Sequence, residues 1–143
     1  QRQMCIRDRR YNALMNRMIA DRGLDLRELA ANLWMDDACI HALHAEGHVV
    51  GLHSHTHPTR LESLSPQEQE HEYRVNAEAL TKRLGEAPTT MSHPCNSYND
   101  ETLRILHDLG VRLGFRANRV AGHTSALEYP REDHANVLKE MGA

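Results

Sequence analysis

The chain of 143 residues is long enough for one hydrophobic core, and its composition is that of an ordinary globular domain, with 40% apolar residues, 26% charged residues and a formal net charge of −3. No run of residues approaches the ~20 apolar positions that a membrane-spanning helix needs, and no basic stripe indicates nucleic-acid binding. Aromatic residues are scarce at 4%, whereas histidines number 11. The histidines are therefore the first place to look for a site.

The N-terminal segment, QRQMCIRDRR, is rich in arginine and lacks the apolar run of a signal peptide. We expect residues 1–10 to be a non-native leader and take residues 11–143 as a single folded domain. The three cysteines, Cys5, Cys39 and Cys95, form no paired pattern, which argues against a disulfide-stabilised secreted domain and favours the cytoplasm. Localisation stays open, because the start of the chain is set aside.

The first part of the chain has the pattern of three helices. Apolar residues at helical spacing predict one helix over residues 11–20 and a shorter one over residues 26–33. Asp36 or Asp37 is the N-cap expected of a third helix, which ends before Gly47.

A short β-branched run, HVVGLH, occupies residues 48–53 and is bounded by turn signals, so we expect a buried strand there. Residues 54–64 have neither the helical nor the strand period and contain Pro58, which predicts a loop.

The longest predicted helix follows this loop. Ser65 suits the N-cap, Pro66 the first helical position and Glu68 the third position of a capping box. The apolar period continues to about residue 84, and Gly85 is the expected stop.

The remaining elements alternate again between strand and helix. Residues 89–93 read as a strand, and Asn99 or Asp100 is the expected cap of a helix that ends at Gly110. Residues 112–117 predict another strand, and the tail ends in a short helix.

Alternating helices and strands predict an α/β fold with parallel strands and helices packed outside them. Only three strands are visible, whereas a closed eight-unit barrel usually takes ~250 residues. The chain therefore holds at most part of a barrel.

Three histidines in five residues, His53, His55 and His57, stand at the end of the first predicted strand, where α/β proteins build their sites. Neutral imidazole is the commonest metal ligand, and a tight turn can bring two histidines four residues apart onto one ion. A single histidine is most often structural, but this cluster indicates metal binding. The histidines in and beside the predicted helices are interpreted as structural or solvated: His41, His44, His48, His71 and His107.

The segment GLHSHTHP, residues 51–58, resembles the histidine motif of the polysaccharide deacetylases, carbohydrate esterase family four. The resemblance extends over roughly residues 35–138. It implies a partial (β/α) barrel of the distorted seven-stranded deacetylase type, with residues 11–143 as the C-terminal part of that domain. It also implies that His53 and His57 hold a divalent metal, often zinc, and that His55 is a variable position.

A second segment, MSHPCNSYND at residues 91–100, is similar to a family motif in which a strand ends in Pro-Tyr-Gly. That likeness implies that Pro94, Cys95 and Asn96 line the substrate groove and that a backbone N–H after the proline holds the oxyanion. Cys95 replaces the usual Tyr and Asn96 the usual Gly, but a backbone donor survives both changes, and Asn tolerates a left-handed turn. The alternative is a plain strand-to-helix turn.

The family's first motif, a strand ending in Phe-Asp-Asp-Gly that supplies the general base and a third metal ligand, does not occur before His53. Asp36 and Asp37 are a poor substitute, because N-capping accounts for both. For the general acid, the resemblance favours His134 in the run PREDH, with His123 as the other candidate.

The resemblance thus implies a hydrolase that removes N-acetyl groups from a carbohydrate by means of a metal-activated water. Its partner is an N-acetylated sugar, and we expect no nucleic-acid partner. Without the Asp-Asp segment, we expect the chain as given to be inactive. Two alternatives stay open: an amidohydrolase-like metallohydrolase, whose barrels also carry His-x-His at a strand end, and a non-catalytic metal-binding domain.

Overall fold

The computed structural model of the protein describes residues 2–122, 125–132 and 134–142, and the chain divides into two compact units, Gln1–Ala42 and Leu43–Ala143. The first unit contains helices α1 (Arg2–Asp21) and α2 (Leu26–Leu33) and the start of α3 (Asp37–Ala45). All three predicted helices are therefore present, and the first begins well before residue 11.

Helices α2 and α3 each begin after an aspartate that caps the N-terminus. Asp25 accepts a hydrogen bond from the backbone N–H of Arg27 at 2.8 Å, and Asp36 accepts one from the backbone N–H of Cys39 at the same distance. The bond from Cys39 lowers the pKa of the Asp36 carboxyl. Asp36 therefore acts as a helix cap, as its position predicted.

The second unit carries the remaining elements: the 3-10 turn η1 (Leu61–Ser63), α4 (Pro66–Leu84), β1 (Thr90–Ser92), the 3-10 turn η2 (Pro94–Asn96), α5 (Asp100–Asp108), β2 (Leu113–Phe115) and α6 (His134–Glu140). The capping box predicted for α4 is formed between Ser65 and Glu68, and Gly85 ends the helix in the left-handed conformation. Asn99 caps α5, also as predicted.

The sheet consists of β1 and β2, which pair in parallel with Met91 opposite Gly114. Isolated parallel bridges extend this pairing on both sides, from Leu52 to Met91 and from Phe115 to Tyr129. Four extended segments therefore lie side by side in chain order. This arrangement confirms an α/β fold with parallel strands, while the seven-stranded barrel stays a prediction.

The predicted strand over residues 48–53 is wrong in its extent, because only Leu52 pairs. Leu52 donates its N–H to the Thr90 carbonyl at 2.9 Å and accepts from the Ser92 N–H at 3.0 Å. Val49 is 75% exposed. A β-branched run forms a strand only where a neighbouring strand pairs with it, and within the described residues β1 forms a bridge with this segment at Leu52 alone.

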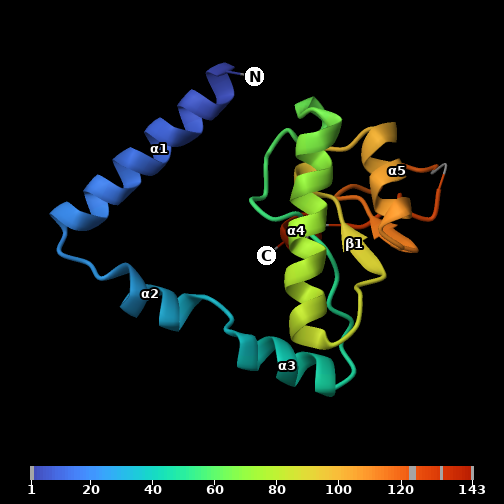
Figure 1. The fold of residues 1–143 in the computed structure, drawn as a ribbon, viewed down its shortest axis with the longest axis horizontal. Helices are drawn as coiled ribbons and strands as arrows, with labels where there is room; N and C mark the ends of the chain where they lie inside the picture. The colour runs from blue at the N-terminus through green and yellow to red at the C-terminus, as the bar shows by residue number, and fades with distance from the viewer. Residues whose placement is uncertain (1, 123–124, 133, 143) are drawn as a thin grey trace. The chain divides into compact units, whose positions relative to one another are not determined.

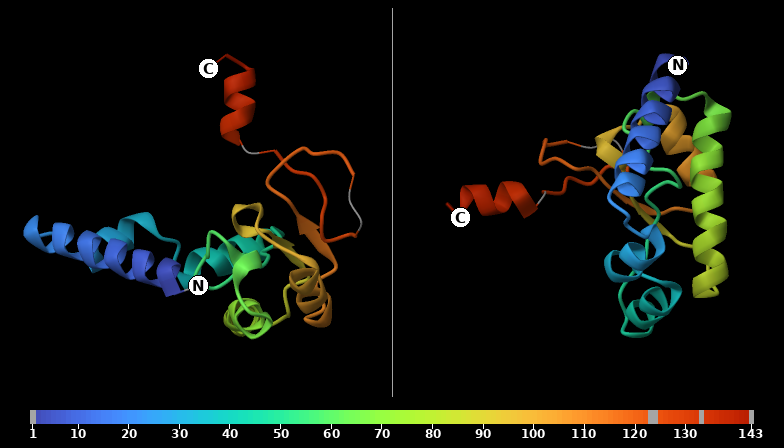
Figure 2. Two further views of the ribbon diagram at one scale, coloured as in Figure 1. Left: turned by 90° about the horizontal axis from the view of Figure 1, so that it is seen from above. Right: turned by 90° about the vertical axis from the view of Figure 1, so that its left-hand side faces the viewer.

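Helices α4 and α5 pack against each other (Figure 1) and lie on the same side of the two strands (Figure 2). The core of the second unit sits between these helices and the extended segments. It is formed by Leu52, Leu61, Tyr73, Met91, Ile105, Leu106, Val111 and Leu127.

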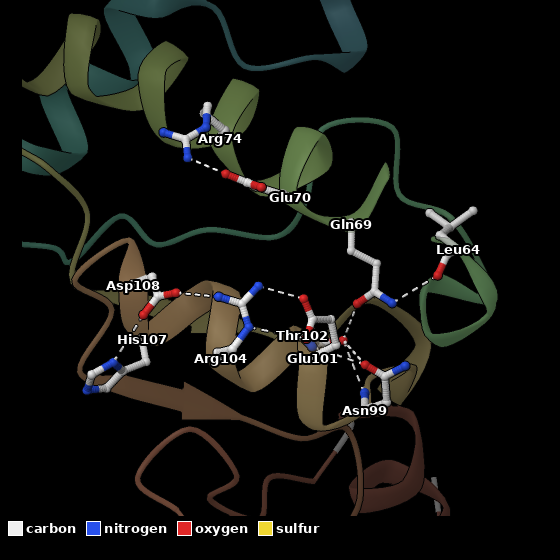
Figure 3. A network of polar contacts seen from close by, with 10 residues as sticks. All are labelled: Leu64, Gln69, Glu70, Arg74, Asn99, Glu101, Thr102, Arg104, His107 and Asp108. Atoms are coloured by element: carbon white, nitrogen blue, oxygen red, sulfur yellow. Dashed lines mark hydrogen bonds and ion pairs between the residues drawn. The ribbon is translucent and has the colours of Figure 1, made fainter. Parts of the chain in front are cut away.

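A buried polar contact joins the two helices (Figure 3). The Thr102 hydroxyl donates to the Gln69 side-chain oxygen at 2.6 Å, and the Gln69 amide donates to the Leu64 carbonyl at 3.1 Å. Gln69 is 1% exposed and Thr102 is fully buried. The contact satisfies both groups in the core and fixes the loop before α4 against α5.

We expect Thr102→Val to lower the free energy of unfolding by about 1–3 kcal/mol, because the isosteric change leaves the buried oxygen of Gln69 without its donor. Thr59→Val at an exposed turn is the matched control and should change the stability by less than about 0.5 kcal/mol. Urea unfolding followed by circular dichroism measures both. Equal stabilities for the two variants would contradict the assigned role of the contact.

Candidate active site

The histidine loop, residues 53–57, begins directly after Leu52, which pairs with β1. The rings of His53 and His57 lie edge to face, with centroids 4.9 Å apart and an interplanar angle of 62°. His55 between them is exposed. The structure therefore brings the two predicted metal ligands together.

The ring of His53 is oriented by the sheet. Its Nδ1 lies 2.8 Å from the backbone carbonyl oxygen of Ser92, the last residue of β1. Because a carbonyl only accepts hydrogen bonds, this contact favours the tautomer in which Nδ1 carries the proton and the lone pair is on Nε2. A backbone carbonyl in this position is the usual partner that orients a metal-binding histidine.

Two residues of the loop have left-handed backbone conformations, Ser54 with φ 63° and His57 with φ 54°. The buried Ser54 hydroxyl accepts a hydrogen bond from the His57 N–H at 3.1 Å, which closes the turn. Left-handed non-glycine residues are strained, and such strain concentrates at functional sites.

Helix α4 holds the same loop from the other side through two side chains. Asn76 accepts a hydrogen bond from the His53 N–H at 3.0 Å. Glu72, 8% exposed, accepts from the N–H groups of His55 and Thr56 at 3.0 and 2.7 Å. Neither residue was predicted from the sequence, although both are polar and lie on the same helix face as the buried Tyr73.

The loop after β1 leaves the sheet at the same edge as the histidine loop, because Leu52 and β1 run parallel. Pro94 is buried and Cys95 is exposed, and Cys95 and Asn96 have left-handed φ values of 50° and 56°. The Asn96 side chain accepts from the Ala117 N–H at 3.0 Å, which ties this loop to the one after β2. The Cys95 N–H makes no hydrogen bond within the described residues.

Hydrogen bonds also join the two loops to each other. Glu62 of η1, which follows the histidine loop, donates its N–H to the Ser97 hydroxyl at 3.1 Å, and its carbonyl accepts from the Asn99 amide at 3.0 Å. The two candidate motifs are thus fixed relative to one another.

Two imidazoles are a suitable partial ligand set for a divalent metal such as zinc, which binds nitrogen ligands well. Within the part of the chain that the structure describes, no group of three or more His, Cys, Asp or Glu side chains is placed to hold an ion. Catalytic zinc sites usually have three protein ligands. The two histidines therefore supply only part of the ligand set of a catalytic metal site.

A buried polar cluster that sequence reasoning missed lies at the carboxyl ends of the strands. His93 is 1% exposed, its Nε2 lies 2.8 Å from the Leu127 carbonyl oxygen, and its ring stacks on Tyr98 with centroids 4.0 Å apart. The Tyr98 hydroxyl donates to Glu128 at 3.0 Å, and the buried Arg116 donates to the Gly122 carbonyl at 2.9 Å. Burial lowers the pKa of His93 to about 4, so the ring is neutral at pH 7.

The two general-acid candidates stay untested. His134 is the first residue of α6, and its side chain lies outside the described part of the chain. His123 is not among the described residues.

The fold and the paired histidines define an α/β protein with a candidate metal site at the carboxyl ends of parallel strands. The family model for polysaccharide deacetylase matches residues 16–114, more than half of the chain. The protein therefore belongs to the polysaccharide deacetylase family. This membership does not favour the amidohydrolase-like alternative.

Solved structures agree with this assignment. The chain is similar to the Streptococcus pyogenes deacetylase PplD in complex with acetate, with 27% identity and a TM-score of 0.63 over 80% of this chain and 54% of that one. It also resembles the BpsB deacetylase domain from Bordetella bronchiseptica, with 12% identity and a TM-score of 0.60 over 69% of this chain and 48% of that one. At 12% identity, the second likeness concerns the fold alone.

A family 4 carbohydrate esterase from Streptomyces lividans in complex with acetate has the same fold, with 20% identity and a TM-score of 0.51 over 55% of this chain and 41% of that one. The chain spans about half the length of these structures. No curated protein sequence matches it. Among the helices described, none combines the length and apolarity needed to cross a membrane.

The buried His93 predicts a pH dependence of stability. Burial lowers its pKa from 6.5 to about 4, so the unfolded chain takes up this proton at a higher pH than the folded chain. The contribution of His93 to stability is complete above pH 6.5 and is lost as the pH falls toward 4. Between pH 7 and pH 5 the loss should be roughly 2 kcal/mol.

Urea unfolding at pH 7 and pH 5 measures this loss. His93→Gln keeps an amide donor for the Leu127 carbonyl but cannot titrate, and should reduce the pH dependence by that amount. His71→Gln on the exposed side of α4 is the control and should retain the dependence of the parent. An unchanged pH dependence in His93→Gln would refute the assignment.

Proposed function

We propose that this protein is a metal-dependent carbohydrate N-deacetylase, which hydrolyses an N-acetyl group on a sugar to acetate and a free amine. The observation that carries the proposal is the His53–His57 pair at the carboxyl end of a parallel segment, with ring centroids 4.9 Å apart. Membership of the polysaccharide deacetylase family supports the reaction class. The similar PplD structure is that of a deacetylase with acetate.

His53 and His57 would hold the metal, for which zinc is the best match to imidazole ligands. His53 would bind through Nε2, because its Nδ1 is engaged with the Ser92 carbonyl. Such an ion supplies a Lewis acid for the acetyl carbonyl and lowers the pKa of a water nucleophile.

The loop of Pro94, Cys95 and Asn96 is proposed to border the substrate. The exposed Cys95 stands in a left-handed turn, and its N–H is free to donate to an oxyanion. A preorganised donor of this kind can lower a transition-state free energy by roughly 3 kcal/mol. The side-chain oxygen of Asn96 accepts from the Ala117 N–H and so helps to shape the loop.

His134 is proposed as the general acid that returns a proton to the leaving amine. The general base and the third ligand implied by the family's Asp-Asp segment have no counterpart beside the two imidazoles among the described residues. This incomplete ligand set also keeps a second function under consideration, that of a non-catalytic metal-binding domain.

We expect the full chain to bind zinc through both imidazoles, with an affinity well below that of sites with three protein ligands, and to release no measurable acetate from N-acetylated chitooligosaccharides. Calorimetry at pH 7 measures the affinity. His53→Ala and His57→Ala should each weaken binding by at least about tenfold. The matched control is His55→Ala, which removes the third histidine of the same loop and should leave the affinity near that of the parent.

Acetate release then separates the two functions. A chimera in which the Asp-Asp strand of an active family member precedes this chain should release acetate if the protein is a deacetylase, and should only bind zinc more tightly if it is a metal-binding domain. Zinc affinity that is insensitive to both His53→Ala and His57→Ala would refute the site. Turnover by the chain alone that disappears in Asp37→Ala would show that the chain contains its own base.

A further inference from the structure

The side chain of Glu72 is the most heavily used acceptor beneath the histidine loop. One carboxylate oxygen, Oε2, accepts from the N–H groups of His55 at 3.0 Å and Thr56 at 2.7 Å. The other oxygen, Oε1, accepts from the Thr56 hydroxyl at 2.6 Å. The two oxygens of this side chain together accept hydrogen bonds from two consecutive residues of the loop.

Because Glu72 is buried, its side chain requires these contacts. Glu72 is 8% exposed, and a carboxylate removed from water requires hydrogen-bond donors in its place. His55 and Thr56 supply those donors from a part of the loop that has no strand partner. Charge-assisted bonds of this kind are stronger than neutral ones.

The positions of the donors explain what the contact does. His55 and Thr56 lie between His53 and His57, so fixing them fixes the path of the chain between the two rings. On either side of them, Ser54 and His57 hold left-handed conformations that they would leave if the loop were free. The contact with Glu72 therefore holds the stretch of chain that connects the two rings, whose centroids lie 4.9 Å apart.

We propose that Glu72 is a positioning residue that preorganises the histidine pair for metal binding, without contacting the metal or the substrate itself. The role in metal binding rests on the proposed function, whereas the positioning of the loop by Glu72 does not. Asn76, one turn further along α4, accepts a hydrogen bond from the His53 N–H at 3.0 Å and supports the loop in the same way.

The test compares Glu72→Gln with Glu78→Gln in the full chain. Both variants remove one negative charge from α4, but Glu78 is exposed. Glutamine at position 72 is nearly isosteric but neutral, so its oxygen can still accept from the two N–H groups, but the charge-assisted bonds become weaker neutral ones. Glu72→Gln should speed hydrogen exchange at the His55 and Thr56 amides by at least about tenfold, and leave the amide of the buried Leu106 in α5 within about twofold of the parent. Glu78→Gln should change none of the three.

Zinc affinity, measured by competition with a chelator well below the melting temperature, is the second measurement. Glu72→Gln should weaken binding by about 10–100-fold, as expected when the support of a metal ligand is removed. Thr56→Val should cause part of this loss, and Thr56→Ser, which keeps the hydroxyl, should restore the parent affinity.

Two results would overturn the proposal. One is a Glu72→Gln variant with the loop exchange rates of the parent. The other is equal acceleration at His55, Thr56 and Leu106, which would mean that Glu72 stabilises the whole fold and has no specific hold on the loop. If the parent binds zinc no better than His53→Ala, the proposed metal site fails, and the exchange rates alone still decide whether Glu72 positions the loop.

Discussion

Parallel pairing of short extended segments is the constraint on which the second unit depends. Leu52, β1, β2 and Tyr129 pair in chain order, each parallel to the one before. A parallel arrangement brings the loop after every segment to the same edge of the sheet, however far apart the loops lie in the sequence. The sheet therefore brings the histidine loop and the loop of Pro94, Cys95 and Asn96 to the same edge. The hydrogen bonds that Glu62 makes with Ser97, as donor, and with Asn99, as acceptor, add to this arrangement.

Strain is confined to these two loops. In the described part of the chain, the non-glycine residues with positive φ are Ser54, His57, Cys95 and Asn96. Each such conformation costs on the order of 1–3 kcal/mol and persists only where the surroundings impose it. Here the surroundings are identifiable side chains: Glu72 and Asn76 hold the first loop, and the Asn96 amide bonds the second loop to Ala117. The core packing of α4 and α5 thereby supports the local geometry of the candidate site.

Helix ends and the histidine pair were predictable because their signals are local. Ser65, Glu68 and Asn99 act as caps through bonds to residues three positions away, and such bonds can be read from spacing. The strand over residues 48–53 was overpredicted because pairing depends on a partner distant in sequence. Glu72 was missed for a similar reason, since its partners precede it by 17 and 16 positions. A signal was nevertheless present: Gln69, Glu72 and Asn76 share the face of Tyr73, and polar residues on a buried helix face must have partners.

Two ionisable side chains near the histidine loop, His93 and Glu72, are buried, and they are accommodated in different ways. Within the described residues the ring of His93 makes one hydrogen bond, to the Leu127 carbonyl, and burial lowers its pKa to about 4, so the ring is neutral at pH 7. Glu72 instead accepts three hydrogen bonds, which replace the water that its side chain loses on burial. On the sheet side, His53 therefore has a neutral neighbour, because the Ser92 carbonyl that orients it directly precedes His93. On the helix side, the loop rests on an anion. A cation held by the two imidazoles would therefore be attracted by the negative charge beneath the loop, and the neutral His93 ring would add no positive charge to oppose it.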